Sequence, residues 1–436
     1  MYTDHNRQLA VELAKRYNGE VINGDAMQLY TGLPIITNKI SDEEQQGIPH
    51  HLLGCIGLNE QTWVVGMFVK KALRTIEEIR SRGKLPILVG GTHYYLQSLL
   101  FKDRLANRDV EPEKRPFVPD TRVEWPILQE NTPVLLDELR RVDPVMADRW
   151  HPNDRRKIQR SLEIYLQTGR KASDIYAEQR QRKIDGSLTD DQDTTVLDSP
   201  TLRFPTLLFW VHAEPAALNA RLEKRVDKML EHGLLDEVRT MDDVAAEEAA
   251  KARPVDETRG IWVSIGYKEF KPYMPVLHNR TSSEQEMASL KADCLEKTNI
   301  ATRQYAKRQV RWIRIKLVNA LREASAHENL YLLDGTEIAS FNDNVITPAI
   351  QLTHNFLTAN SNLPDPSSLS NAAAEMLTPK RDYDLSAQPE KWSKRYCDLC
   401  DVTCVTEDSW NMHAKSKAHR KLVSKRKKAA EEHTGG

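Results

Sequence analysis

Long apolar segments are missing from this sequence of 436 residues, which has no run of about 18 consecutive apolar residues. The N-terminus is also polar, with Asp4, His5, Asn6 and Arg7 where a secretion signal would need an apolar stretch. The sequence therefore predicts a protein that neither spans a membrane nor carries a standard secretion signal.

Cysteine is scarce as well. Cys55 and Cys294 stand alone in the sequence, whereas Cys397, Cys400 and Cys404 lie close together. Five cysteines in this pattern do not make a disulfide framework for a chain of this length. We therefore expect a reducing compartment, with the cytoplasm first and the nucleus and the mitochondrion left open.

Net charge is almost absent, because 62 Lys and Arg residues face 63 Asp and Glu residues. A neutral average can hide opposed patches, and here it does. Residues 303–316 hold six Lys and Arg residues and no acid, and residues 391–428 hold eleven against four acids. Each basic segment is a candidate surface for nucleic acid, and the alternative is a solvated charged face.

Apolar segments rich in β-forming residues alternate with helical patterns, and 40% of the chain is hydrophobic. The predicted strands lie in 20–23, 84–91 and 206–212, and each is followed by an amphipathic helical pattern. This alternation predicts an α/β domain with a parallel sheet. Between the second and third strands, Asn153 or Asp154 can cap a helix that Gly169 ends, which predicts an inserted helical subdomain.

The C-terminal region carries a metal-binding pattern, Cys397-x2-Cys400-x12-His413-x5-His419. Two thiolates and two imidazoles at this spacing are typical ligands of a tetrahedral Zn²⁺ in a finger. Cys404 is expected to be an ordinary buried thiol. The basic residues around the finger favour a nucleic-acid contact over a protein contact, with a solvated tail or a nuclear-import segment as the alternative.

These patterns predict six regions. They are a first part of the α/β core (1–110), an inserted helical subdomain (111–200), a second part of the core with a basic helix (201–355), a flexible linker (356–390), a C2H2-type zinc finger (391–425) and a basic, disordered tail (426–436).

Two residues next to predicted strands are candidates for chemistry. Asp25 follows the first strand, at the edge of the sheet where α/β proteins form their sites, although an Asx turn explains it equally well. Thr92 follows a strand that ends in two glycines and precedes a helix, so it can donate to a phosphate or simply cap the helix.

Two sets of cations are candidates for binding phosphates. Arg221 and Arg225 lie one helical turn apart and can converge on a diphosphate, or they can pair with nearby acids. The second set lies along one predicted helix and consists of Arg303, Lys307, Arg311 and Arg314, with the aromatic residues Tyr305 and Trp312 between them. Such a helix is typical of an RNA-binding surface, and also of a packed helix with a solvated basic side.

Six segments in this order, GDAMQLY, NKISDEEQQGIPHHLL, LVGGTHYYLQSLL, HPNDRRKIQRSLE, SIGYKEF and TRQYAKRQ, resemble the tRNA dimethylallyltransferase (tRNA isopentenyltransferase) family. The added finger resembles the eukaryotic branch of that family. The resemblance covers residues 8–335 and 391–425. It implies a P-loop NTPase-like parallel core and the transfer of a dimethylallyl group from its diphosphate to N6 of the adenosine 3′ of the anticodon in tRNA.

The resemblance also implies roles for single residues. Asp25 would be the general base, and Thr92 and Arg225 would complete the catalytic set, with Arg221 beside them on the diphosphate. The flipped base would be lined by Asp25, Ala26, Met27 and Gln28. The anticodon stem-loop would be contacted by two helical segments, through Arg156, Lys157, Ile158, Gln159 and Arg160 and through Arg303, Gln304, Lys307, Arg308 and Arg311. The implied partners are tRNA and dimethylallyl diphosphate, the implied metals are Zn²⁺ in the finger and Mg²⁺ with the diphosphate, and the implied state is a monomer that binds no membrane.

One family feature is replaced in this sequence. A strand and a glycine-rich phosphate loop ending in Gly-Lys-Ser/Thr precede the helix of QLAVELAKRYNGE in the family, and MYTDHN occupies that place here. We therefore expect this chain to bind diphosphate weakly and to catalyse little or no transfer. A gene model whose true start lies upstream and a non-catalytic tRNA-binding remnant are the two explanations, and a relative of the small-molecule nucleotide kinases is a third, weaker hypothesis for the protein.

Overall fold

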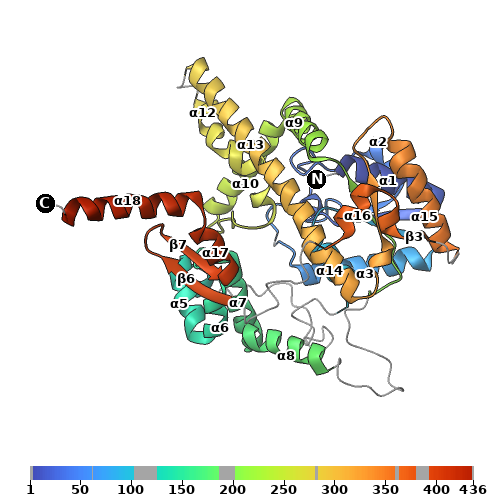
Figure 1. Cartoon of the computed structure of the whole chain (residues 1–436). Coiled ribbons are helices and arrows are strands. Elements are labelled where there is room, and N and C mark those ends of the chain that lie inside the picture. The colour runs from blue at the N-terminus through green and yellow to red at the C-terminus, as the bar shows by residue number, and fades with distance from the viewer. Residues whose placement is uncertain are drawn as a thin grey trace. The chain divides into compact units, whose positions relative to one another are not determined.

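The computed structural model describes residues 3–60, 62–102, 125–185, 202–279, 283–358, 363–379 and 392–434. These residues form two compact units (Figure 1). The first unit contains residues 1–105 and 200–382, and the second contains residues 106–199 and 383–436. The finger therefore shares a unit with the helical insertion. The end of the predicted insertion (186–200) and the last two residues of the basic tail lie outside the described residues.

The first sheet of the core comes from the N-terminal part of the chain. β1 (Gly19–Asn23) is buried along its whole length and pairs in parallel with β2 (His50–His51) on one side and β3 (Leu85–Val89) on the other. The prediction of parallel strands over 20–23 and 84–91 is thus confirmed. The helices of this part are α1 (Thr3–Arg16), α2 (Asp42–Gln45), α3 (Val65–Ser81) and α4 (His93–Leu100).

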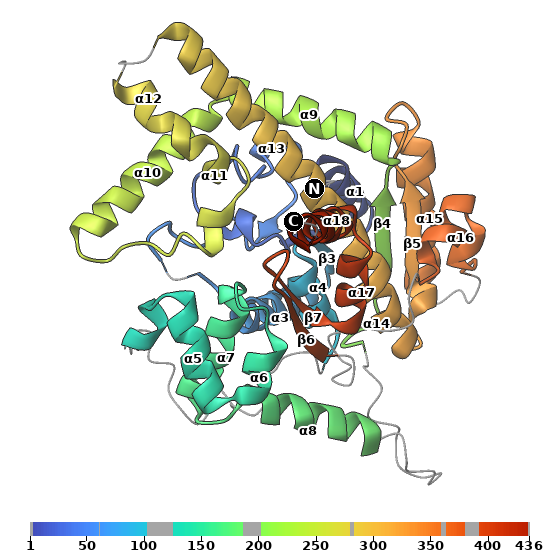
Figure 2. The same ribbon diagram turned by 60° about the vertical axis from the view of Figure 1, so that its left-hand side comes forward.

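The second sheet of the core pairs β4 (Leu208–His212) in parallel with β5 (Leu330–Asp334), and Figure 2 shows the two strands side by side. The strand predicted at 206–212 is confirmed. Within the described ranges, no helix is both long and apolar enough to cross a bilayer. The helices of this part are α9 (Pro215–Glu231), α10 (Leu234–Ala250), α11 (Tyr267–Phe270), α12 (Met274–Asn279), α13 (Glu284–Trp312), α14 (Val318–Glu323), α15 (Thr347–Leu357) and α16 (Asn371–Leu377).

An apolar slot separates the two sheets. Among the described residues, β3 pairs only with β1 and β4 only with β5, so one edge of each strand has no strand partner. A cavity of about 450 Å³ is lined by all five residues of β3 and by residues 208–211 of β4. The residues of β3 are only half-buried, although their sequence is LPILV. This geometry is that of a parallel sheet from which one central strand is missing.

The segment after α15 is partly folded, which contradicts the prediction of a flexible linker over 356–390. Ser370 caps α16 by accepting a hydrogen bond from the Ala373 amide at 3.0 Å, and Ala373 is fully buried against the second sheet. Arg314 also donates to the Glu375 carbonyl at 3.0 Å. Low apolar content misled the prediction, because small alanine side chains suffice for this close packing.

In the second unit, the insertion is a bundle of α5 (Thr132–Val142), α6 (Pro144–Arg149), α7 (Arg155–Thr168) and α8 (Ala172–Asp185). The predicted limits of α7 are confirmed. Asp154 accepts a hydrogen bond from the Lys157 amide, and Gly169 ends the helix with a φ of 70° in the left-handed region. The finger follows with β6 (Trp392–Cys397), β7 (Val402–Thr406), α17 (Glu407–Ala414) and α18 (Lys417–Thr434).

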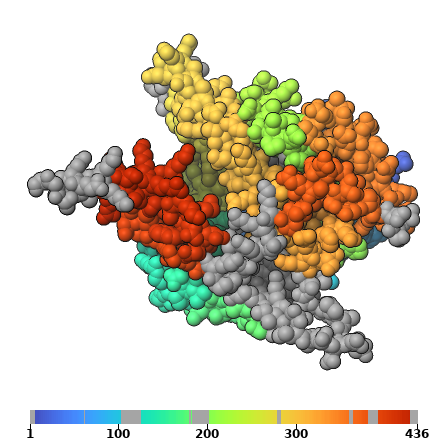
Figure 3. All heavy atoms as spheres, viewed as in Figure 1, coloured from blue at the N-terminus to red at the C-terminus, as the bar shows by residue number. Residues whose placement is uncertain are grey.

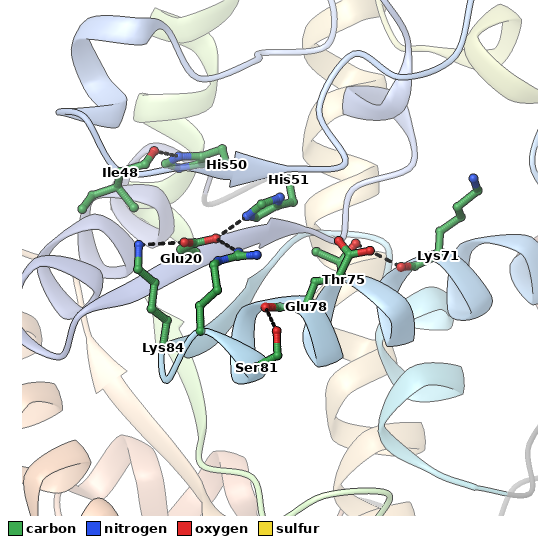
Figure 4. A network of polar contacts seen from close by, with 10 residues as sticks. Glu20, Ile48, His50, His51, Lys71, Thr75, Glu78, Ser81 and Lys84 are labelled. Atoms are coloured by element: carbon green, nitrogen blue, oxygen red, sulfur yellow. Dashed lines mark hydrogen bonds and ion pairs between the residues drawn. The ribbon is translucent and has the colours of Figure 1, made fainter.

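A buried carboxylate holds the N-terminal end of the first sheet together (Figure 4). Glu20 in β1 is only 3% exposed, and its two oxygens contact His51 at 2.6 Å, Arg82 at 2.6 Å and Lys84 at 2.8 Å. Burial alone would raise the pKa of this carboxyl group, but the hydrogen bonds from Lys84, His51 and Arg82 outweigh burial and lower the pKa to about 2.

We expect Glu20→Gln to lower the free energy of unfolding at neutral pH by about 2 to 3 kcal/mol, because Arg82, Lys84 and the His51 ring lose their shared carboxylate. The folded-state pKa is depressed, so this contribution is present above the pKa of an unfolded glutamate and is lost as the pH falls from about 4.5 toward 2. Urea unfolding at several pH values measures the effect. The control Glu78→Gln removes an exposed pair with Arg74. Equal losses in the two variants would contradict the assignment.

Candidate active site

The C-terminal ends of β1 and β3 approach each other closely, and two glycines allow it. The Gly24 amide donates to the Val89 carbonyl at 2.7 Å, and the Thr92 amide donates to the Gly24 carbonyl at 3.3 Å. A Cβ atom on Gly90 would lie 2.2 Å from the Gly24 carbonyl carbon, so no other residue fits there without moving the backbone. This contact brings the segments after the two strands together.

Asp25 and Thr92 are linked through this junction. Asp25 Oδ1 accepts a hydrogen bond from the Met27 amide at 2.9 Å, as in an Asx turn. Thr92 Oγ1 accepts from the Ala26 amide at 2.9 Å and makes no capping bond to its own helix. Asp25 can therefore form the Asx turn and also act as a base, since the turn occupies only Oδ1 and holds the carboxylate, with its second oxygen Oδ2, in place.

Both side chains line a cavity of about 240 Å³ that also receives Arg225 from α9 and Arg308 from α13. Two guanidinium groups against one carboxylate give this cavity a net positive charge, which favours an anionic ligand. The rest of the wall is largely apolar, with Ile36, Val226, Met229, Val263 and Ile265. The cavity thus suits a small molecule with a charged end and a hydrocarbon end.

Tyr305 lines the same cavity, although the sequence suggested it as part of an RNA-facing surface. Burial, and then the negative charge of Asp25, raise the pKa of Tyr305 to about 12. Its phenol is therefore protonated at neutral pH and can donate a hydrogen bond. Trp312, the other interleaved aromatic, stacks on His93 with ring centroids 5.1 Å apart. Both aromatics pack inward, as the alternative reading expected.

Ser264 was missed by the sequence analysis. It lines the cavity and is 4% exposed, and no described atom accepts or donates a hydrogen bond at its Oγ. A buried hydroxyl at a cavity wall without a partner is a ready donor to a ligand. The residue lies inside the segment SIGYKEF, but a lone serine in a short motif carries no signal of its own.

Arg221 does not reach this cavity. Its guanidinium donates to the carbonyl oxygens of Gly335 at 2.8 Å and Thr336, at the end of β5. In this structure its donors hold a loop of the second sheet, and the prediction that Arg221 binds diphosphate stays a prediction. Gln28 is 5% exposed and donates to the Asn38 carbonyl at 3.2 Å, and its predicted contact with the flipped base stays a prediction. Ala26 does not line the cavity, whereas Met27 does.

The predicted RNA-binding residues of α13 lie mostly on one exposed face. Gln304, Lys307, Arg308 and Arg311 are exposed and have the i, i+3, i+4 and i+7 spacing that puts them on one side of a helix. Arg303 differs, because it pairs with Glu223 at 2.6 Å and with Glu296 at 3.1 Å.

The predicted RNA-binding residues of α7 are divided between its two faces. Ile158 is fully buried in the core of the insertion and Gln159 is 8% exposed, so Ile158 serves packing here, and the predicted tRNA contacts of both residues stay predictions. Arg156 and Lys157 are exposed. Lys157 pairs with Asp154 at 3.0 Å and Arg160 with Glu163 at 3.2 Å.

The finger brings its four predicted ligands together. One ligand atom from each of Cys397, Cys400, His413 and His419 lies within 4.8 Å of the others. His413 Nε2 is buried without a hydrogen-bond partner among the described residues, as expected of a nitrogen that binds a metal. The set fits tetrahedral Zn²⁺, which would tie the hairpin to the helices. Cys404 is 5% exposed in β7 and lies outside this set.

Comparison with known families explains this combination of features. Residues 28–316 match the family described as IPP transferase, and residues 395–419 match a zinc finger of C2H2 type. The chain belongs to the IPP transferase family. The family resemblance inferred from the six motifs is thereby confirmed, together with the zinc finger of the eukaryotic branch.

Individual relatives align over nearly the whole length of this chain. It is 40% identical to the tRNA dimethylallyltransferase of Schizosaccharomyces pombe, with 97% of this chain and 93% of that protein covered. It is 33% identical to the tRNA dimethylallyltransferase of Homo sapiens, covering 96% and 84%. A crystal structure of a eukaryotic dimethylallyltransferase acting on tRNA has a TM-score of 0.72 and 33% identity, covering 99% of this chain and 96% of that one.

Proposed function

We propose that the protein transfers a dimethylallyl group from dimethylallyl diphosphate to N6 of the adenosine 3′ of the anticodon in tRNA. The observation that carries this proposal is the cavity that joins Asp25, Thr92, Arg225 and Arg308 to an apolar wall. The diphosphate suits the cationic end, and the five-carbon group suits the apolar wall. Membership of the IPP transferase family supports the same reaction class.

The reaction asks three things of these side chains. The N6 lone pair attacks the first carbon of the dimethylallyl group while the bond from that carbon to the diphosphate oxygen breaks. Asp25 takes the proton that leaves N6. Thr92 and Arg225 donate to the departing diphosphate, and the protonated phenol of Tyr305 is a further donor in the same cavity.

The adenine must leave its stack before it can meet Asp25, which is the general requirement for chemistry on a base. We propose that the exposed Gln304, Lys307 and Arg311 of α13 hold the backbone of the anticodon stem-loop while the base enters. A single chain supplies all of these groups, which supports a monomer. Mg²⁺ is proposed to arrive with the diphosphate, since one carboxylate and a few neutral oxygens suit a cation that keeps most of its waters.

Two measurements test this proposal. Anticodon stem-loop RNA is expected to bind the chain, and mass spectrometry is expected to detect a dimethylallyl group on the target adenosine when the chain is extended by a strand and a phosphate loop before Gln8. A stem-loop with purine riboside at that position lacks the 6-amino group and should receive none. Tight RNA binding by the extended chain without any transfer would instead support the non-catalytic RNA-binding hypothesis.

A further inference from the structure

Within the second unit, a cation–aromatic cluster connects the helical insertion to the finger. The guanidinium carbon of Arg149, at the end of α6, lies 4.0 Å from the ring centroid of Trp392, 4.6 Å from that of Trp150 and 5.5 Å from that of Tyr176. Trp150 and Tyr176 belong to the insertion, whereas Trp392 is the first residue of β6 in the finger. One side chain of the insertion thus touches both parts of the unit.

A second contact repeats the connection two residues further along β6. Lys394 Nζ donates a hydrogen bond to the Ala147 carbonyl of α6 at 3.2 Å, and burial lowers the pKa of Lys394. The β6–β7 ladder shifts its register between Trp392 and Arg395, and on this irregular stretch Trp392 and Lys394 each contact α6 directly, through Arg149 and the Ala147 carbonyl. Figure 3 shows the surface of the finger, in red, lying against that of the insertion, in teal and green.

The insertion holds its side of the cluster rigidly. Trp150 Nε1 donates to Ser161 Oγ of α7 at 2.9 Å, which fixes the plane of the indole. Lys157 Nζ lies 5.1 Å from the centroid of the same ring. Trp150, a partner of Arg149, is thus held by contacts inside the insertion itself, which limits the side-chain freedom that its contact with Arg149 can cost.

The unpaired cations of this unit are concentrated on the finger. Lys415, Lys417, Arg420, Lys421, Lys425 and Arg426 are exposed, and none forms an ion pair with a described residue. Cations of the insertion are more often neutralised, as in the pairs of Arg140 with Asp137 at 2.6 Å and Arg141 with Glu138 at 2.5 Å. The position of the finger therefore decides where this unit presents free positive charge.

We propose that Arg149 is a positioning residue that fixes the zinc finger on the insertion, so that Lys415 and the free cations of α18 meet phosphates of the same RNA that the insertion contacts. This inference rests on the proposed function for the identity of the RNA. It replaces the picture of a finger that hangs from a flexible tether. The finger then contributes a surface of fixed geometry, and fixing it removes an ordering cost from RNA binding.

The test uses the full chain and anticodon stem-loop RNA across a salt series. Arg149→Ala is expected to weaken binding about three- to tenfold and to flatten the salt dependence, because fewer phosphates are neutralised together. Bound zinc should stay at one ion per chain. Cys397→Ser removes a zinc ligand, and in that background Arg149→Ala should have no further effect on affinity. Additive effects of the two changes would overturn the proposal.

Matched variants separate loss of the Arg149–Trp392 contact from a general loss of folding. Trp392→Ala changes the finger side of the same contact and should reproduce the affinity of Arg149→Ala, which keeps the test valid if Arg149→Ala unfolds the insertion. Arg141→Ala removes an exposed cation 70% open to solvent on α5 and should leave the salt dependence unchanged. Normal RNA affinity in both Arg149→Ala and Trp392→Ala would refute the proposal that the Arg149–Trp392 contact positions the finger. Failure of the unaltered chain to bind RNA would instead refute the proposed function.

Discussion

Extending the chain before Gln8 by an apolar strand and a loop ending in Gly-Lys-Thr is expected to raise single-turnover prenyl transfer at least about a thousandfold. Backbone amides and a lysine on a phosphate form charge-assisted hydrogen bonds of about 1.5 to 3 kcal/mol each, so two or three of them suffice. The added strand would fit the slot between β3 and β4. The cavity that runs along both strands also reaches Gly90 and Gly91, next to Thr92, so a loop that follows the strand would lie near Thr92.

A second extended chain separates filling the slot from binding the phosphate. It carries the same strand followed by a Gly-Ser loop of equal length, without lysine or threonine. We expect this control to resist urea better than the unextended chain, since the strand buries apolar surface of β3 and β4, while its prenyl transfer stays low. Full activity of the unextended chain, or unchanged stability of the control, would contradict the prediction.

The slot also shows how far the sequence determines the fold. Residues 84–91 and 206–212 were predicted as two parallel strands, because apolar segments that alternate with helical patterns are compatible with few folds other than a parallel α/β sheet. The same pattern does not predict the order in which the strands lie next to each other in the sheet. Pairing of β4 with β5 joins residues more than a hundred positions apart, and the sequence between 313 and 346 offered no alternation that singled out Leu330–Asp334 as a strand.

The candidate site was predicted where it depends on strand ends and missed where it depends on helix rotation. Asp25 and Thr92 follow strands, so their common edge was foreseeable. Arg221 and Arg225 differ by one helical turn, yet Arg225 faces the cavity and Arg221 faces the carbonyls of Gly335 and Thr336. Spacing alone places two residues on one side of a helix and does not say which neighbour each will meet.

Two residues that lie among cations in the sequence face inward in the structure. The resemblance groups Ile158 with Arg156, Lys157 and Arg160 on RNA, whereas helical periodicity alone puts Ile158 on the inner face, and it lies in the core of the insertion. For Tyr305 the sequence allowed both an RNA surface and a packed helix, and the ring lies at the cavity wall. A cluster of cations in the sequence therefore does not say which of its neighbours a helix turns inward.

In the extended, active chain, Asp25→Asn is expected to lower single-turnover prenyl transfer by about a hundredfold to ten-thousandfold, the usual contribution of a general base. The substitution is nearly isosteric, and its amide oxygen can still accept the hydrogen bond from the Met27 amide. The turn after β1 should therefore survive, and RNA affinity should change little. What is lost is the group that can take the N6 proton.

A second Asx turn provides the matched control for Asp25→Asn. Asp256 Oδ1 accepts a hydrogen bond from the Thr258 amide at 2.9 Å, and Asp256 does not line the cavity. Asp256→Asn should leave prenyl transfer unchanged, since it alters the same kind of turn away from the reacting atoms. Transfer rates at saturating RNA and RNA dissociation constants for both variants separate chemistry from docking. Normal transfer by Asp25→Asn would remove Asp25 from the role of base, and an equal loss in Asp256→Asn would show that the rate reports folding and not proton transfer.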